Sequence, residues 1–422
     1  MLRKPMILII LTVLTLILAG ALIIVFRRAP ANGKIYIRCD GTVDPLTAEL
    51  LRNGDVYTFT ANIHEPIAVQ RNNIVIDGNG YSIEGNGTQG VYLHETKNVT
   101  IKNTRITGFQ RGINLHSSIN SRLINNTITN CTYGIISSEA PQSIISNNTV
   151  INNEWDGIFL TSSDGSILND NIVTNHSKWG IYLGFSAECV LRNNMMTANR
   201  WNFGVSVKFI HDIDTSNIVN GRLMYYWRNQ HDKNVPSDAG HVALINSTNI
   251  TVKDLTLSNN GQGLILVNST NCLVENSNLT ENGYYGVQLV DSENNTIRYN
   301  TITQNVQYAI ASERSTQNTI NNNTIENNYQ GIHMHDSNDN MIYHNNFSNN
   351  TLQTSSTNSK NTWDDSYPSG GNHWSDHEAA DLYSGPNQNM PGNDGICDTP
   401  YVIDTNNTDR YPLASPISHE PP

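Results

Sequence analysis

The chain has 422 residues, with 37 acidic and 25 basic side chains and a formal net charge of −12 at pH 7. Such an acidic chain lacks the positive surface that nucleic acids require, so we expect no nucleic-acid partner. Hydrophobic residues make up 37% and charged residues 15% of the sequence. A composition this polar is typical of disorder, but here the polar residues recur at regular intervals, which predicts a folded repeat protein.

An apolar segment without charges, residues 6–26, lies near the start of the chain and has basic residues on both sides. As a helix that rises about 1.5 Å per residue, it would span roughly 31 Å, the thickness of a hydrocarbon core. We therefore expect residues 1–31 to contain a single-pass transmembrane helix that anchors the chain in the cell membrane, with the bulk of the chain extracellular. A long signal peptide cleaved near Ala29–Ala31 is the alternative.

Three further segments follow from the pattern. Residues 32–72 are expected to be an N-terminal cap, because the ends of a repeat array need covering. The repeats occupy residues 73–350, with an irregular excursion at residues 212–248 where the pattern is lost. Residues 351–422 are rich in Gly, Pro, Asp and Trp and are expected to be a C-terminal cap or tail.

The repeat unit is 22 or 23 residues long, and its most regular feature is an Asn between two hydrophobic positions. Asn tolerates the left-handed backbone of a tight turn, and equivalent Asn amides in stacked coils can hydrogen-bond to one another. We therefore expect Asn148 and Asn171 to be vertical neighbours. The Asn residues at this position are Asn126, Asn148, Asn171, Asn194, Asn300, Asn323 and Asn345.

Later in each unit, a Gly precedes a short alternation of apolar and other residues, as in Gly112–Leu115, Gly180–Leu183 and Gly286–Leu289. Such alternation is typical of a short strand with one buried face. We predict an all-β fold, a right-handed, single-stranded parallel β-helix of about twelve coils. The expected interior column contains Ile113, Ile135, Ile158, Ile181, Val205, Leu264, Val287, Ile310 and Ile332.

Five tracts of the sequence resemble one known family: Arg71–Gly78, Pro236–Gly240, Asn322–Ile325, Gly370–Asp376 and Asp394–Tyr401. On these tracts the chain resembles archaeal members of the NosD-like family, which are described as periplasmic copper-binding proteins or as carbohydrate-binding and sugar-hydrolase (CASH) repeat proteins. The resemblance covers nearly all of the chain after residue 32 and implies a pectin-lyase-like solenoid. A NosD-type accessory role in copper-site maturation would also imply an ABC-transporter partner.

Catalysis is not favoured by the positions expected to point outward from the Gly-led strands. Carbohydrate-active enzymes commonly use paired carboxylates, and these positions hold no stacked acidic pair. A polysaccharide lyase, epimerase or hydrolase is therefore an alternative and not the favoured interpretation. The expected outward positions are Tyr92, Asn114, Ile136, Phe159, Tyr182, Ser206, Ile265, Gln288, Ala311 and His333.

Aromatic residues precede several of the Gly-led strands. Trp155, Trp179, Trp201 and Phe203 would form an aromatic strip on the outer surface if they stacked on successive coils. Flat aromatic faces suit the C–H groups of sugars, so the strip is a candidate glycan platform. The alternative is an aromatic ladder that only stabilises the stack.

Two candidate metal sites can be named. His333 and His335 alternate on one strand and His344 follows on the next coil, a set of imidazoles suited to copper. In the tail, oxygen-bearing side chains surround a Gly turn and suit Ca²⁺. The candidate calcium ligands are Asn393, Asp394, Asp398 and Asp404.

Taken together, the sequence predicts a membrane-anchored extracellular β-helix with a non-catalytic role in surface binding or cell-envelope structure. Surface glycans or envelope proteins are the expected partners. The NosD-type accessory role in copper-site maturation and the polysaccharide lyase or epimerase remain the alternatives.

Overall fold

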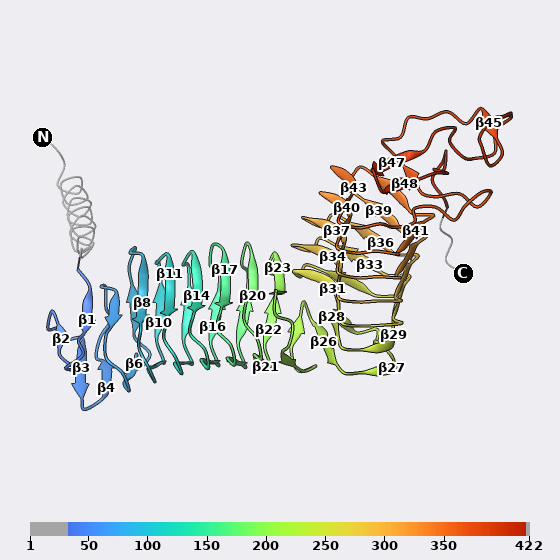
Figure 1. Ribbon diagram of the computed structural model, residues 1–422. Helices are drawn as coiled ribbons and strands as arrows, with labels where there is room; N and C mark the ends of the chain where they lie inside the picture. The colour runs from blue at the N-terminus through green and yellow to red at the C-terminus, as the bar shows by residue number, and fades with distance from the viewer. Residues whose placement is uncertain (1–32, 419–422) are drawn as a thin grey trace, which may run out of the picture.

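The computed structural model describes residues 33–418, whose regular structure is entirely β-strand (Figure 1). Within this range, no helix is long and apolar enough to cross a membrane. The transmembrane helix expected in residues 1–31 lies outside the described residues. The strands form a parallel β-solenoid of about 14 turns, rather than the expected twelve. Pairing before residue 73 and after residue 350 accounts for the additional turns.

Figure 1 shows two stacks of coils that meet at an angle, which we call the elbow. Each coil of the first stack contributes strands to three sheets. The first sheet contains β2 (Val43–Asp44), β1 (Ile35–Ile37), β5 (Ile67–Val69), β8 (Gln89–His94), β11 (Arg111–His116), β14 (Tyr133–Ser138), β17 (Asp156–Thr161), β20 (Trp179–Gly184) and β23 (Trp201–Ser206). The second sheet contains β3 (Leu50–Asn53), β4 (Val56–Phe59), β6 (Val75–Asp77), β9 (Thr100–Lys102), β12 (Arg122–Ile124), β15 (Ile144–Ser146), β18 (Ile167–Asn169), β21 (Val190–Arg192) and β24 (Asp212–Ile213).

The third sheet is shared by both stacks. In the first stack it contains β7 (Ser82–Glu84), β10 (Arg105–Thr107), β13 (Thr127–Thr129), β16 (Thr149–Ile151), β19 (Ile172–Thr174), β22 (Met195–Thr197) and β25 (Ile218–Val219). In the second stack it contains β26 (Arg222–Arg228), β28 (Ala239–Ile245), β31 (Gln262–Val267), β34 (Tyr285–Val290), β37 (Tyr308–Glu313), β40 (Gln330–His335) and β43 (Leu352–Thr357).

Two sheets belong to the second stack alone. One contains β27 (His231–Asn234), β29 (Thr248–Lys253), β32 (Leu273–Glu275), β35 (Thr296–Arg298), β38 (Thr319–Asn321) and β41 (Met341–Tyr343). The other contains β30 (Thr256–Ser258), β33 (Asn278–Thr280), β36 (Thr301–Thr303), β39 (Thr324–Glu326), β42 (Asn346–Ser348) and β44 (His373–Trp374). The tail adds two small hairpins, β45 (Tyr383–Ser384) with β46 (Met390–Pro391) and β47 (Tyr401–Asp404) with β48 (Asn407–Asp409).

The expected Asn column is confirmed. Asn148 donates from Nδ2 to Asn171 Oδ1 over 3.0 Å and to the carbonyl of Leu123 over 2.9 Å, inside the stack. The left-handed backbone lies one residue earlier, at Asn147 with φ 54° and Asp170 with φ 56°. The column Asn is therefore a buried hydrogen-bonding residue, and its neighbour supplies the turn.

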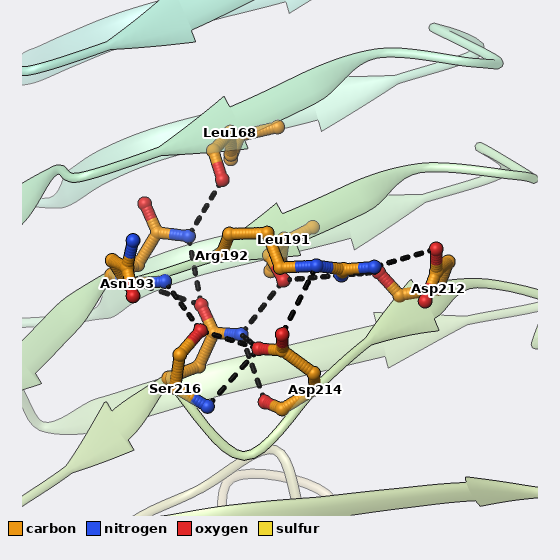
Figure 2. Close-up of polar contacts among 9 residues, drawn as sticks. Leu168, Leu191, Arg192, Asn193, Asp212, Asp214 and Ser216 are labelled. Atoms are coloured by element: carbon orange, nitrogen blue, oxygen red, sulfur yellow. Dashed lines mark hydrogen bonds and ion pairs between the residues drawn. The ribbon is translucent and has the colours of Figure 1, made fainter.

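The Asn column continues into the last coil of the first stack, where Arg192, Asp212 and Asp214 lie close to it (Figure 2). Asn194 Nδ2 donates to Asn217 Oδ1 over 2.9 Å, and Asn217 Nδ2 donates to the Leu191 carbonyl over 2.8 Å. Arg192 pairs with Asp212 at 2.6 Å and with Asp214 at 3.1 Å. These contacts hold the chain in register up to the elbow.

The elbow begins where the chain reverses. β25 and β26 pair antiparallel around a turn in which Asn220 and Gly221 have positive φ. The third sheet then continues with the long strands of the second stack. Residues 212–248 therefore form strands of the solenoid, β24 to β29, and not the expected irregular excursion.

The second stack covers the open end of the first. Outward side chains of its first coils are buried in the core of the first stack, which removes the exposed apolar end that a solenoid must otherwise cap. These side chains are Ala243, Ile245, Ile265, Val267 and Val290. The inward side chains of the same strands form the separate core of the second stack, which includes Val242, Leu244, Leu264, Leu266 and Val287.

The expected interior column differs at the elbow in two respects. Ile181 is paired with Phe203, and Val205 is paired with Leu183 instead. The register is shifted because Gly204 lies beside Tyr182 and leaves room for the ring of Trp179. The column also ends here, since Leu264 belongs to the second core.

The tail closes the far end of the second stack. The buried ring of Trp374 stacks on Phe347 with 4.3 Å between centroids and on Tyr401 with 4.2 Å. Trp374 Nε1 donates to Asp409 Oδ2 over 2.9 Å. The first strand of the tail hairpin is thus packed directly on the last coils.

Candidate functional site

The long strands of the two stacks face each other across the inner angle of the elbow (Figure 1). Backbone contacts fix their separation at the vertex: Gly261 N donates to the Phe203 carbonyl over 2.7 Å. The side chain of Gln262 also crosses the vertex, and its Nε2 donates to the Val205 carbonyl over 2.7 Å. The outward side chains of these strands therefore converge on a common space.

Aromatic rings gather at the vertex and along both arms. Trp179 lies 4.9 Å from Tyr182 and 5.1 Å from Tyr284, measured between ring centroids. On the arm of the first stack, Tyr182 stacks on Phe159 at 5.0 Å. The arm of the second stack carries a column of three stacked rings, in which the centroids are 5.4 and 4.7 Å apart. The rings of this column are Tyr285, Tyr308 and His333.

The strip expected from Trp155, Trp179, Trp201 and Phe203 is not formed as a continuous outer surface. Phe203 is fully buried, and Trp179 is only 6% exposed because it packs in the elbow. Trp201 lies beside Trp179 at 4.9 Å. Trp155 is 37% exposed but stands apart, with the ammonium of Lys178 4.1 Å from its ring centroid.

A cleft of about 440 Å³ occupies the inner angle. This is within the range of about 300–1,000 Å³ typical of small-molecule sites. Residues of both stacks form it, although they are far apart in the sequence. Its polar and aromatic lining consists of Tyr182, Ser206, Phe209, Gln262, Tyr284, Tyr285, Gln288, Glu313 and Arg314.

Hydroxyl and amide groups in the cleft form two separate sets of hydrogen bonds. Tyr182 Oη donates to Ser206 Oγ over 2.8 Å, and Tyr284 Oη donates to Tyr182 Oη over 3.4 Å. On the second arm, Gln262 Nε2 donates to Gln288 Oε1 over 3.1 Å. Gln262 Oε1 is buried without a hydrogen-bond partner.

Two phenols of the cleft, Tyr284 and Tyr285, remain protonated. Burial raises the pKa of Tyr285 to about 12. Burial also raises the pKa of Tyr284, with a further contribution from its hydrogen bond to Tyr182. Both hydroxyl groups are therefore neutral at physiological pH: that of Tyr285 can donate to an acceptor oxygen, and that of Tyr284, which donates to Tyr182, can accept.

The charged side chains at one end of the cleft are paired with one another. The Arg314 guanidinium donates to the two carboxylate oxygens of Asp291 over 2.7 and 3.0 Å and also to Glu313. These hydrogen bonds raise the pKa of Arg314. Among the described residues that line the cleft, Glu313 is the sole carboxylate. The cleft thus offers neither a free cation nor a pair of carboxylates.

A larger trench, of about 690 Å³, follows the turns of the first stack between Asn86 and Ser177. Its side chains include amides already bonded to one another, as Asn175 Nδ2 is to Asn152 Oδ1 over 2.6 Å. The trench is the outer edge of the stacked turns, and the elbow cleft is the better candidate.

The histidines considered for copper are not gathered into one site. His333 Nδ1 lies 2.9 Å from Ser355 Oγ, and His335 Nε2 lies 3.4 Å from Asp336. His344 is on a turn, where its Nε2 lies 2.9 Å from the Ser369 carbonyl. In residues 33–418, no group of three or more His, Cys, Asp or Glu side chains is placed to hold a metal ion.

The oxygen atoms considered for calcium bind backbone amides of the tail. Asp398 accepts hydrogen bonds from the amides of Leu382 and Tyr383, and Asp394 accepts one from Gly385. Asp404 accepts from the amide of Asn406 and from the side chain of Asn407. The side chain of Asn393 is exposed.

Sequence reasoning did not identify the elbow cleft. Tyr182 and Gln288 were recognised as outward-facing, but Tyr182 and Tyr284 are 102 residues apart and meet only because the stacks meet. The one local signal was the pair Tyr284–Tyr285 directly before a Gly-led strand.

Two family profiles match the sequence. Residues 208–379 match the family described as "Periplasmic copper-binding protein (NosD)", and residues 67–223 match "Right handed beta helix region". No curated protein matches the chain.

Solved structures with similar folds include three carbohydrate-active proteins. The A-module of mannuronan C-5 epimerase AlgE6 from Azotobacter vinelandii is 14% identical, with 73% of this chain and 88% of that chain covered and a TM-score of 0.34. The periplasmic alginate epimerase AlgG is 14% identical, with 78% and 83% covered and a TM-score of 0.30. The catalytic unit of a GH87 α-1,3-glucanase from Streptomyces thermodiastaticus is 12% identical, with 64% and 58% covered and a TM-score of 0.32.

Proposed function

The chain belongs to the NosD-like family of parallel β-helix repeat proteins, and we propose that it is a non-catalytic extracellular protein that binds a neutral glycan in the elbow cleft. The observation that carries the proposal is the convergence of stacked aromatic rings and neutral hydrogen-bonding groups in one concave space. Tyr182 on the first arm faces Tyr285 and Gln288 on the second. A periplasmic family is consistent with the bulk of the chain lying outside the cytoplasm.

The physical argument rests on the two kinds of surface that a sugar presents. Its C–H faces are apolar and pack on aromatic rings such as those of Tyr182 and Tyr285, which bury large areas at low entropic cost. Its hydroxyl groups need donors and acceptors, which Tyr284, Tyr285 and Gln288 supply at fixed positions. A ligand bound between rigid strands loses little additional conformational freedom of the protein, which favours affinity.

Charge favours a neutral glycan over an acidic one. Arg314 is already bound to Asp291 and Glu313, so one cation faces two carboxylates. A polyuronate would have to approach this end of the cleft without a free cation to pair with. A neutral glycan carries no carboxylates for Asp291 and Glu313 to repel.

The test is affinity electrophoresis of the chain in gels containing neutral glucans, mannans or galactans, with alginate and pectate as acidic counterparts. We expect retardation by at least one neutral polysaccharide and none by the acidic ones. Tyr285→Ala should abolish the retardation, because the half-buried Tyr285 ring lines the cleft and begins the aromatic column of the second arm.

Tyr81→Ala is the matched control. The exposed Tyr81 lies on a turn of the first stack, outside the residues of the cleft. Equal retardation of both variants, or retardation only by acidic polysaccharides, would overturn the proposal.

A further inference from the structure

The cleft continues into a second compartment of a different character. This compartment has a volume of about 360 Å³ and lies where the long strands of both stacks end. Val207, Phe209, Val290 and Arg314 line both spaces, so the two are continuous. The apolar residues that line the second compartment are Val207, Phe209, Ile210, Ile245, Val267 and Val290.

Large apolar side chains are exposed around this compartment. Val207 is 60% exposed and Ile210 is 46% exposed. Phe185, on the turn that follows β20, is 55% exposed. Exposed apolar residues that gather at one place mark a binding surface more often than scattered ones do.

The backbone provides a second, independent observation. Phe185 and Val207 have φ of 50° and 69°, and Val207 is the centre of a γ-turn in which Lys208 N bonds to the Ser206 carbonyl over 2.8 Å. Left-handed φ is unfavourable for a β-branched residue. Nearby turns in the corresponding position carry polar residues, namely Ser117, Glu139, Ser162, Asn246, Asn268, Asp291 and Arg314, all with positive φ. Val207, which lines the compartment, and Phe185, one coil before it, are thus the apolar exceptions among these turns.

Both basic side chains at the rim of the compartment are paired with carboxylates, and Glu188 adds a further negative charge to its lining. Lys208 pairs with Asp164 at 3.0 Å, and Arg314 pairs with Asp291 at 2.7 Å. Neither cation is free to select an anionic head group. The compartment is therefore suited to an uncharged apolar group.

We propose that the two compartments hold one amphipathic ligand, a neutral glycoside with an apolar aglycone. The sugar lies against Tyr182, Tyr285 and Gln288, and the alkyl or isoprenoid aglycone passes Phe209 and fills the second compartment. The sugar part of this ligand rests on the proposed function, and the inference adds the apolar aglycone to which the sugar is attached. No bond is made or broken.

The test is a titration of the full chain with methyl, butyl, hexyl and octyl β-D-glucosides below their micellar concentrations, followed by tryptophan fluorescence. Trp179 and Trp201 lie beside the cleft and should report binding. Affinity should rise with chain length by up to about fourfold for each methylene group that becomes buried. 1-Octanol, which lacks the sugar, should bind more weakly than octyl glucoside.

The double variant Phe185→Asn/Val207→Asn separates binding from folding. Asn suits the positive φ at both positions, so the variant should unfold at the same or a higher temperature than the parent chain. It should nevertheless lose most of the dependence on chain length. Ser162→Asn, in the corresponding turn one coil before Phe185, is the matched control and should retain that dependence.

The outcomes distinguish this inference from the proposed function. No binding of octyl glucoside, or affinity independent of chain length, overturns the amphipathic ligand, while retardation by neutral polysaccharides would still stand. Octanol that binds as tightly as octyl glucoside also overturns it, because the compartment would then be a purely apolar site. Failure of all neutral polysaccharides, with chain-length dependence intact, would instead overturn the polysaccharide-binding function.

Discussion

The ring of Trp179 occupies the space that a side chain on Gly204 would fill: a Cβ on Gly204 would lie 2.6 Å from Trp179 Cζ3. Gly261, across the elbow, approaches the same ring, and its Cβ would lie 3.1 Å from Cζ3 and 2.9 Å from the Gly204 Cα. One indole ring thus packs between glycines of the two stacks. The angle of the elbow depends on the absence of side chains at both positions.

Gly204→Ala should therefore destabilise the joint. The added methyl group must displace the buried ring of Trp179 or that of Tyr182, and overpacking of this kind typically costs about 1–3 kcal/mol. The loss should be visible as a lower midpoint of urea unfolding and as a change in tryptophan fluorescence. Gly33→Ala, where nothing lies within 4 Å of the added Cβ, is the control and should leave both unchanged. An unaltered midpoint for Gly204→Ala would contradict the close approach.

The buried Asn column should be far more sensitive to substitution than the turn beside it. In Asn171→Ala, Asn148 N and Nδ2 lose their common acceptor and the Ile145 carbonyl loses its donor. Each buried polar group left unpaired costs about 1–3 kcal/mol, so we expect a loss of at least about 3 kcal/mol in the free energy of unfolding.

Asn147→Gly provides the comparison for the column. Asn147 has φ 54°, which Gly adopts without strain. This variant should change the free energy of unfolding by less than about 1 kcal/mol. If chemical denaturation gave similar losses in the free energy of unfolding for Asn171→Ala and Asn147→Gly, the column would contribute no more to stability than the turn does.

These two features differ in how far the sequence predicts them. The spacing of 23 residues between Asn148 and Asn171 is a property of the sequence, and the stacked coils follow from it directly. The elbow depends on the reversal of the chain at Asn220 and Gly221. It also depends on the sheet to which the long strands belong, which is the first sheet in the first stack and the third sheet in the second stack. Neither has a periodic signal, so the interior column was wrongly continued from Val205 to Leu264.

The sequence does not predict the candidate site, for the same reason. Tyr182 and Gln288 are outward-facing in any parallel β-helix with this repeat, and the sequence shows that much. Their convergence requires the outward side chains of β28 and β31 to cover the end of the first stack. Ile265 is apolar at an outward position, but so are Ile136 and Phe159, which remain partly exposed, so this character alone does not predict the contact.

Acid should weaken the elbow. Burial lowers the pKa of His241 to about 4 and that of His211 to about 4. In the unfolded chain both imidazoles have a pKa near the ordinary value of about 6.5, so they become charged at a higher pH than in the folded chain. The unfolded state therefore binds more protons between pH 4 and pH 6.5, so stability is complete above pH 6.5 and falls as the pH drops towards 4. Each histidine contributes up to about 3 kcal/mol to this loss.

His241→Leu isolates the contribution at the joint. Both ring nitrogens of His241 are buried without hydrogen-bond partners, and the ring lies 5.2 Å from Phe203. Leu at this position should retain stability at pH 7 and reduce the difference in melting temperature between pH 7 and pH 4.5. His94→Gln, at an exposed position, should leave that difference as it is.

The tail should respond to pH in the opposite direction. Burial raises the pKa of Asp409 to about 7, despite hydrogen bonds from Trp374 Nε1 and the amide of Asn372 that favour the charged form. The folded state keeps a proton that the unfolded state loses, so this contribution is complete below about pH 4 and is lost as the pH rises to 7. Hydrogen exchange of the Trp374 indole should therefore be faster at pH 7.5 than at pH 5.5 after correction for intrinsic rates. Corrected rates that are equal would argue against a protonated Asp409.

Trp155 distinguishes the aromatic surface expected from the sequence from the one that the fold creates. Its ring is exposed, contacts Tyr133 edge-on at 5.2 Å and lies under Lys178, away from the residues that line the cleft. Trp155→Ala should therefore leave glycan affinity within about twofold of the parent chain. Tyr285→Phe, which removes only a hydroxyl group, should weaken it by about tenfold, the equivalent of one hydrogen bond of about 1.4 kcal/mol. Isothermal titration with the glycan retained in gels measures both. If Trp155→Ala were the more damaging change, the binding surface would lie along the first stack and not in the elbow.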